Sequence, residues 1–191
     1  MSDIISSIAA EYRRYKALGQ AAIAQLSDAE LARPEAGESN SIAVVVWHIS
    51  GNLKARFTDF RTADGEKPWR NRDEEFVDRV VTRGELLTKW ESGWNVLLET
   101  LSTLTDEDLH QSVTIRGQSH SIHEALHRSL AHTTYHVGQI VYIAKAIRGE
   151  AWTSLSIPKG QSAAYNQNPH RETAEGHEAM LRKRMGGEGA T

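Results

Sequence analysis

The stretch that decides the fold is SIHEALHRSLAHTTYHVGQIVYIAKAIRG, residues 121–149. Ser121 is a preferred residue type at a helix N-cap, and Glu124 three positions later completes a capping box, while Gly149 is a typical C-terminal stop. When the stretch is projected at 100° per residue, its apolar residues fall within about 60° of Thr133. The sequence therefore predicts one long amphipathic helix with a single face in the core.

This predicted helix carries two pairs of histidines with the same spacing, His123 with His127 and His132 with His136. Relative to Thr133, the first pair lies at about 80° to 120° and the second at about −100° to −60°, on opposite flanks of the apolar stripe. Residues four apart on a helix have Cβ atoms about 5–6 Å from each other, so either pair can present two imidazoles to one metal ion. Spacing does not choose between the pairs, and a third ligand must come from elsewhere.

His48 offers such a ligand, in the helical pattern SNSIAVVVWHISGNLKARFTDFRT of residues 39–62. The candidate N-caps of this helix are Ser39, Asn40 and Ser41. His48 begins a polar string that borders the apolar face and continues through Asn52, Arg56 and Asp59. Polar groups at the edge of a core are costly unless they are paired, so the string indicates a cleft or an internal network. The alternative is a snorkelling Arg56 with hydrogen-bonded neighbours.

Composition limits the classes of function. A chain of 191 residues with 39% hydrophobic residues can form one domain with a self-sufficient core. The balance of 22 Lys and Arg against 25 Asp and Glu gives a net charge of −3, which argues against a dedicated nucleic-acid binder with a broad basic face. With no cysteine in the chain, a thiolate metal site and a Cys nucleophile are excluded, so thiol chemistry would need a thiol brought by a substrate.

The start of the chain, MSDIISSIAAEYRR, lacks the basic and then apolar order of a signal peptide. The longest apolar run, Ile42–Trp47, is far shorter than the roughly 20 residues that span a membrane. We therefore expect a cytoplasmic protein.

Two more long helices are predicted, from Asp3 to about Gln25 and from Thr82 to about Leu104, the second with Trp90 and Trp94 on its core face. Residues 112–120 alternate around Arg116-Gly117 and predict a small hairpin that leads into the helix beginning at Ser121. Four long helices fit a helical bundle.

The segment ADGEKPWRNRDEEF, residues 63–76, is rich in Gly, Pro and charges of both signs. One interpretation is a solvated loop. The other is a lid or specificity loop, in which Trp69, Arg70 and Arg72 bind an anionic ligand near the mouth of the bundle.

Residues 151–191 have few apolar side chains and predict an extended arm followed by a flexible tail. Trp152, Leu155 and Ile157 are its expected anchors on the bundle, and a brief helix is expected around residues 175–184.

His48 on the second long helix, with the run HTTYHVGQI at residues 132–140 on the last, resembles the DinB-like (YfiT-type) metalloprotein superfamily over roughly residues 1–150. The stretches GNLKARFTDFRTADGEKPWRNRDEEF and WTSLSIPKGQSAAYN further look like an uncharacterised branch of that superfamily. The resemblance selects His48, His132 and His136 as the metal ligands.

The resemblance implies an all-α, up-down-down-up four-helix bundle at residues 1–150 that binds a divalent ion, zinc or nickel, through three imidazoles. Open positions on the ion would take water or substrate. The resemblance also implies homodimers and a small-molecule substrate. The net charge and the short apolar runs argue against a nucleic-acid or membrane partner. Characterised relatives include S-transferases that use low-molecular-weight thiols and a mycothiol-dependent isomerase, so the metal site carries over more directly than a reaction.

We hypothesise that the metal activates an exogenous thiol or water, in a reaction of the S-transferase or hydrolase type. Asn52, Arg56 or Asp59 would orient a ligand or a metal-bound imidazole. Gln139, on the same flank as His132 and His136, is a further candidate. The alternative is a non-enzymatic metal-binding stress or accessory protein.

Overall fold

The computed structural model describes residues 3–34 and 39–187, which are mostly helical with a small two-stranded sheet. The helices are α1 (Ile4–Ala24), α2 (Asp28–Ala32), α3 (Ile42–Phe57), α4 (Arg83–Ser102), α5 (Ile122–Arg148), α6 (Ser162–Gln167) and α7 (Ala174–Gly187). The strands are β1 (Ser112–Ile115) and β2 (Gln118–Ser121), and the short 3-10 helices are η1 (Asp73–Phe76), η2 (Asp106–His110) and η3 (Gly149–Ala151).

Local capping signals explain where the long helices begin. At the start of α5, the Ser121 backbone N–H donates to the Glu124 carboxylate at 2.8 Å, and the Glu124 N–H donates to the Ser121 hydroxyl at 3.2 Å. The same reciprocal pair, Thr82 with Glu85, opens α4, and the Ser41 hydroxyl accepts the N–H of Val44 at the start of α3. These helix starts follow from sequence because a cap involves only neighbouring residues.

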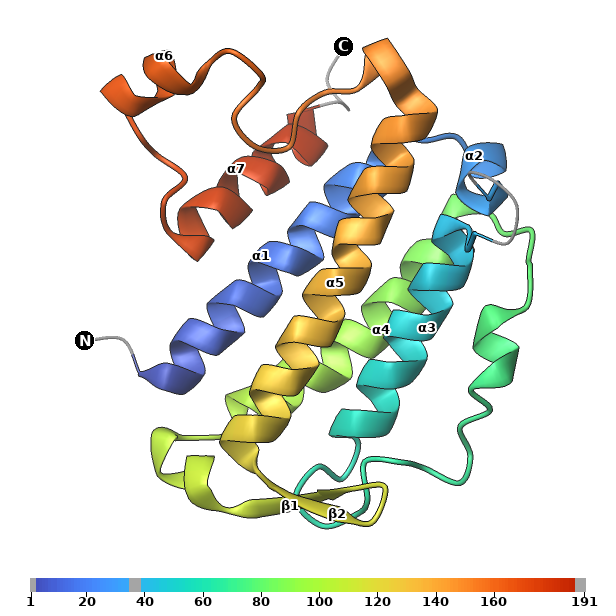
Figure 1. The fold of residues 1–191 in the computed structure, drawn as a ribbon, viewed down its shortest axis with the longest axis vertical. Helices are drawn as coiled ribbons and strands as arrows, with labels where there is room; N and C mark the ends of the chain where they lie inside the picture. The colour runs from blue at the N-terminus through green and yellow to red at the C-terminus, as the bar shows by residue number, and fades with distance from the viewer. Residues whose placement is uncertain (1–2, 35–38, 188–191) are drawn as a thin grey trace.

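Helices α1, α3, α4 and α5 lie side by side (Figure 1). Helix α3 contacts both α4 and α5, and α1 contacts both α5 and α4. In the view of Figure 1, α1 and α5 run upward and α3 and α4 run downward. One face of α5 therefore borders α3, so side chains of these two helices can approach one another there.

The core lies between these helices and includes the predicted aromatic pair. Trp90 and Trp94 are fully buried on α4, with ring centroids 5.2 Å apart. Gly19 of α1 lies against this pair, since a Cβ atom at that position would stand 2.7 Å from Trp90 Cη2. Side-chain-free backbone at Gly19 thus lets α1 approach the indole closely.

The segment between α3 and α4 is fastened to the β-hairpin. The Asp64 carboxylate accepts the backbone N–H groups of Arg116 and Gly117 at 2.8 and 2.7 Å, and the Gly65 N–H donates to the Thr114 carbonyl at 2.7 Å. Arg116 and Gly117 both have positive φ, 53° and 72°, as a two-residue turn of this type requires. The predicted hairpin is confirmed, and it brings a loop and a turn together at one end of α3.

The C-terminal segment packs against the first helix. Leu155 is buried, as predicted for an anchor, and its carbonyl lies 2.8 Å from Nε2 of the buried His177. Helix α7 contacts α1 and buries Leu181 completely. Where the sequence predicted a brief helix in a tail, the structure has a helix of 14 residues. Leu181 and its neighbours Met180 and Met185 supply the apolar side of this helix. Residues 188–191 of the predicted tail lie outside the described part.

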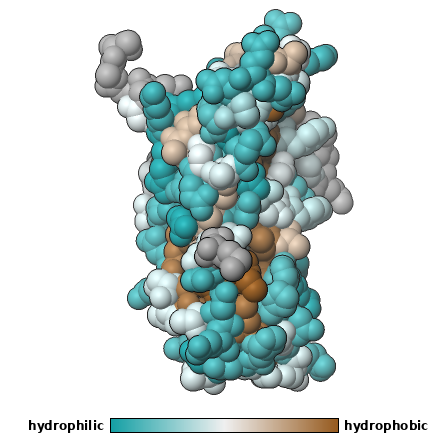
Figure 2. Space-filling view, turned by 90° about the vertical axis from the view of Figure 1, so that its left-hand side faces the viewer, coloured by the Kyte–Doolittle hydropathy of each residue, from teal (hydrophilic) through white to brown (hydrophobic). Residues whose placement is uncertain are grey.

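The face of the molecule shown in Figure 2 is mainly hydrophilic, and its hydrophobic residues are concentrated in a strip in the lower half. Within residues 3–34 and 39–187, no helix combines the length and the apolar content that crossing a bilayer would require.

Candidate metal centre

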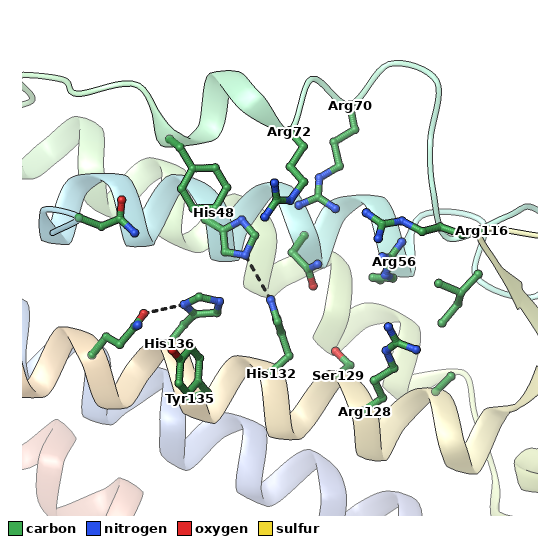
Figure 3. Close-up of a pocket in the computed structure, with 16 residues that line it drawn as sticks. His48, Arg56, Arg70, Arg72, Arg116, Arg128, Ser129, His132, Tyr135 and His136 are labelled. Carbon is green, nitrogen blue, oxygen red and sulfur yellow. Dashed lines mark hydrogen bonds between the residues drawn. The ribbon is translucent and has the colours of Figure 1, made fainter. Parts of the chain in front are cut away.

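Three histidines from two helices converge in one place (Figure 3). His48 comes from α3, and His132 and His136 come from adjacent turns of α5. One ring nitrogen of each can be chosen so that all three lie within 4.8 Å of one another, and the Nε2 atoms of His48 and His132 are 3.2 Å apart. Two ligands at 2.0–2.1 Å on a tetrahedral ion are separated by about 3.3 Å. These side chains could therefore hold a metal ion.

The outward-facing nitrogens of two of these rings are fixed by acceptors. His48 Nδ1 lies 2.9 Å from Glu75 Oε2, and His136 Nδ1 lies 2.7 Å from Gln139 Oε1. Both oxygens accept hydrogen bonds, so each Nδ1 carries the proton and each Nε2 keeps its lone pair. This arrangement orients the two imidazoles so that Nε2 is the donor atom available to a metal.

Glu75 is held as an anion by a buried arginine. Arg70 donates to both carboxylate oxygens, at 2.7 and 2.8 Å, and its side chain is only 3% exposed. Burial raises the pKa of Glu75, but the hydrogen bonds from Arg70 and His48 outweigh this effect and hold the pKa below its usual value. Gly51 makes room for the carboxylate, since a Cβ atom there would lie 2.0 Å from Oε1.

The two histidines that α5 contributes to this cluster, His132 and His136, are neutral at neutral pH. Burial, with the neighbouring His136 and His48, lowers the pKa of His132 to about 4. Burial also lowers the pKa of His136, against the hydrogen bond to Gln139. A neutral imidazole is the form that binds a metal, so protons compete weakly for these ligand positions.

The histidines line a pocket of about 410 Å³, and His132 and His136 are only partly buried in its wall. Its lining is polar and strongly basic. The residues are Asn40, His48, Asn52, Arg56, Arg70, Arg72, Phe76, Ile115, Arg116, Ala125, Arg128, Ser129, His132, Tyr135, His136 and Gln139. The candidate ligands thus face a space in which a small molecule fits.

Five residues predicted from sequence to contact a ligand line this pocket, namely Asn52, Arg56, Arg70, Arg72 and Gln139. Two of them hold other residues of the candidate site: Gln139 accepts from His136, and Arg70 donates to Glu75. The predicted orienting role of Gln139 toward an imidazole matches this contact.

Asp59 and Trp69 lie elsewhere, which corrects their predicted placement. Helix α3 ends at Phe57 and Asp59 has φ of 48°, so the helical projection that aligned it with His48 does not extend that far. Asp59 lines a groove with Phe60 at the far end of the helix. Trp69 is 57% exposed and lies in a groove beside Trp47, because the loop turns Arg70 inward and Trp69 outward.

Sequence reasoning missed Glu75 and two basic groups of the pocket, Arg116 and Arg128. Asp73, Glu74 and Glu75 are three consecutive acids in a loop without periodicity, so no local pattern marks the one that turns inward. The usable signal is chemical: a metal-binding imidazole needs an acceptor for its other nitrogen, and an acidic residue in a loop that covers α3 can provide it.

The fold and the pocket define a mostly helical protein with a candidate three-histidine metal centre. A family model described as "Protein of unknown function (DUF1572)" matches residues 2–161, and the chain belongs to this family. The family falls within the DinB/YfiT-like clan, in agreement with the resemblance seen in the sequence. No curated protein and no solved structure matched the chain.

Proposed function

We propose that this protein is a DinB-like metalloprotein that binds one divalent ion, zinc or nickel, through His48, His132 and His136. One combined observation carries the proposal. The Nε2 atoms of His48 and His132 lie 3.2 Å apart, and the Nδ1 atoms of His48 and His136, on the far side of their rings, face hydrogen-bond acceptors. Imidazoles packed only for structure have no need of this common orientation. Metal ligands do, because their lone pairs must converge.

We further propose that α1, α3, α4 and α5 form the up-down-down-up four-helix bundle of that superfamily. The opposite courses of α1 and α5 relative to α3 and α4 in Figure 1 support this assignment. In such a bundle, metal sites are built from side chains on facing helices, as His48 and the α5 pair are placed.

The reaction that we propose is the activation of an exogenous thiol or water, of the S-transferase or hydrolase type. A divalent ion held by three neutral imidazoles supplies Lewis acidity, which promotes ionisation of a thiol or of water near neutral pH. The chain has no cysteine, so the thiol must be a substrate. Neutral His132 and His136 leave the positive charge of the ion uncancelled, and the pocket beside them admits the substrate.

The polar wall of the pocket would position that substrate. Asn52 lies on α3 one helical turn beyond His48, and its amide can both donate and accept a hydrogen bond. Tyr135 lines the same pocket from α5 and is 65% exposed, so its ring stands at the entrance.

Elemental analysis of protein purified without a metal-affinity tag tests the metal site. We expect about one ion per chain in the wild type and none in His48→Ala, His132→Ala or His136→Ala, since two imidazoles bind a divalent ion much more weakly than three. The loaded protein is then assayed with a panel of thiols and electrophiles and with hydrolysable esters and amides. Absence of stoichiometric metal after reconstitution with zinc, nickel, manganese or iron would refute the proposal. Metal without turnover would favour a non-enzymatic metal-binding role.

A further inference from the structure

In Figure 3, Arg72 lies beside His48, whereas Arg56, Arg116 and Arg128 lie toward the other end of the pocket. Five arginines line the pocket together with the three histidines. The arginines come from α3, from the loop before α4, from the hairpin turn and from α5. These arginines are Arg56, Arg70, Arg72, Arg116 and Arg128, and among residues 3–34 and 39–187 no Asp or Glu lines the pocket with them.

Three of the five arginines are bound to acids behind the pocket wall. Arg70 makes its two bonds to Glu75, while Arg56 and Arg116 share Glu66 at 3.5 and 2.7 Å. Among the described residues, the ion pairs of these five guanidinium groups thus involve two carboxylates, Glu66 and Glu75, so the arginines outnumber their ion-paired acids.

The other two arginines, Arg72 and Arg128, have no acidic partner within residues 3–34 and 39–187. Both side chains are exposed on the pocket side. The Arg72 guanidinium lies over the Phe76 ring, 4.8 Å from its centroid, a contact that orients the group and leaves its N–H donors at the edge. Arg72 and Arg128 are thus two permanently charged guanidinium groups whose N–H donors are available to a ligand.

The crowding of like charges adds to the attraction for an anion. Burial lowers the pKa of Arg56. The neighbouring positive charges of Arg70 and Arg116 lower this pKa further, whereas the Glu66 carboxylate raises it. An anion bound among these groups relieves their mutual repulsion and can accept two parallel bonds from a guanidinium.

We propose, on the basis of the function proposed above, that the substrate carries an oxoanion group, a carboxylate, sulfonate or phosphate, which Arg72 and Arg128 bind while its reacting atom faces the histidines. Arg128 lies four residues before His132 on α5, so the Cβ atoms of the two are about 5–6 Å apart. The substrate is therefore compact, with its anionic group only a few bonds from the reacting atom. Arg56 and Arg116 extend the positive field behind that group.

Calorimetric titration with simple probes tests this inference. Succinate and inorganic phosphate supply the oxoanions, and succinamide supplies the uncharged counterpart of succinate. Each is titrated into zinc-loaded and zinc-free protein. We expect both anions to bind the zinc-loaded wild type with dissociation constants in the roughly millimolar range, and succinamide not to bind.

The Arg72→Gln/Arg128→Gln double variant should bind both anions about 100-fold more weakly, roughly tenfold for each charge-assisted contact that is lost. The matched control is Arg33→Gln/Lys145→Gln, which removes the same charge from two exposed positions outside the pocket. Its affinity should stay within about twofold of wild type, since exposed charges at a distance are screened.

The outcomes separate this inference from the metal site. Equal anion affinity in the wild type and the Arg72→Gln/Arg128→Gln variant, or no binding of either anion to the zinc-loaded wild type, would overturn the inference. Anion binding that depends on zinc and not on the arginines would overturn it as well. Failure of zinc to bind, with arginine-dependent anion binding intact in the zinc-free protein, would refute the metal site and support the anion subsite.

Discussion

Helix α5 carries two histidine pairs with the same spacing and nearly the same internal geometry. The ring centroids of His132 and His136 are 4.6 Å apart, and those of His123 and His127 are 4.3 Å apart. His123 and His127 are nevertheless exposed. Within the described part of the chain, His132 and His136 lie close enough to His48 for the three side chains to share one ion, whereas His123 and His127 belong to no such group of three.

The difference lies in what surrounds each pair. His132 and His136 occupy the flank of α5 that faces α3, where His48 supplies a third nitrogen and Glu75 and Gln139 fix the protonated side of two rings. On the opposite flank, none of residues 3–34 and 39–187 brings a third ligand to His123 and His127. An H-x3-H spacing therefore specifies only two ligands; the neighbouring helix and the outer acceptors make the candidate site.

The largest expected effect on zinc affinity comes from replacing histidines of one pair and then of the other with alanine. His132→Ala should weaken zinc binding by more than the roughly 10- to 100-fold that loss of an outer hydrogen-bonding partner costs, because it removes a ligand itself. His123→Ala/His127→Ala should keep the stoichiometry and affinity of the wild type. Competition titration with a chromophoric zinc chelator measures both. A larger loss in the His123→Ala/His127→Ala variant would reverse the assignment.

Removing the charge behind His48 should have the next largest effect. Glu75→Gln keeps the shape of the side chain but loses the anion that accepts from His48 and pairs with Arg70. We expect zinc affinity to fall by about 10- to 100-fold. The free energy of unfolding of the metal-free protein should also fall, by about 1–3 kcal/mol, because the guanidinium of Arg70 stays buried without a counterion.

The matched control for that variant is Glu74→Gln, which removes the same charge from the exposed neighbouring residue. Chelator competition and urea unfolding of both variants separate local orientation from net charge. If Glu74→Gln lowers zinc affinity as much as Glu75→Gln does, the contact between Glu75 and His48 has no specific role in metal binding.

A smaller effect is expected at Gln139, which is only partly buried, so that water can replace its contact to His136 Nδ1. Two substitutions should act in opposite directions. Gln139→Leu removes the acceptor and should weaken zinc binding by up to about tenfold, whereas Gln139→Glu makes the acceptor an anion and should strengthen it. The same titration measures both, and a shift of both variants in one direction would contradict the proposed orientation of the ring.

Much of the fold could be predicted from sequence because its signals are local. The capping boxes at Ser121 and Thr82 and the turn at Arg116-Gly117 involve residues within three positions of one another. The boundaries of α1, α4 and α5 therefore differ from their predicted limits by at most two residues, and the core position of Trp90 and Trp94 follows from helical periodicity.

The candidate site could be predicted only in part. Spacing marked both histidine pairs on α5, and the resemblance to a family, not the periodicity, chose between them. Glu75 and Arg116 lie in segments whose paths depend on long-range contacts, such as those of Asp64 with the hairpin turn. Asp59 was assigned to a helix face that ends before it, because a projection cannot locate the residue at which the backbone leaves the helix.

The smallest expected effect is a pH dependence specific to the pair that faces α3. In the metal-free protein, the pKa of His132 is lowered to about 4, whereas an unfolded histidine titrates near 6.5. Between these values the unfolded chain binds a proton at this residue that the folded protein does not, so the free energy of unfolding falls as the pH decreases from about 6.5 to about 4. This contribution to stability is fully present above about pH 6.5.

The variant His132→Gln, whose side chain does not titrate, should lose less stability between about pH 6.5 and about pH 4. The slope of its unfolding free energy against pH should be smaller than that of the wild type by the equivalent of less than one bound proton. Urea unfolding at several pH values measures it, and the carboxylates that titrate in the same range are common to both proteins. Identical slopes would mean that burial in the cleft between α3 and α5 does not suppress protonation of His132.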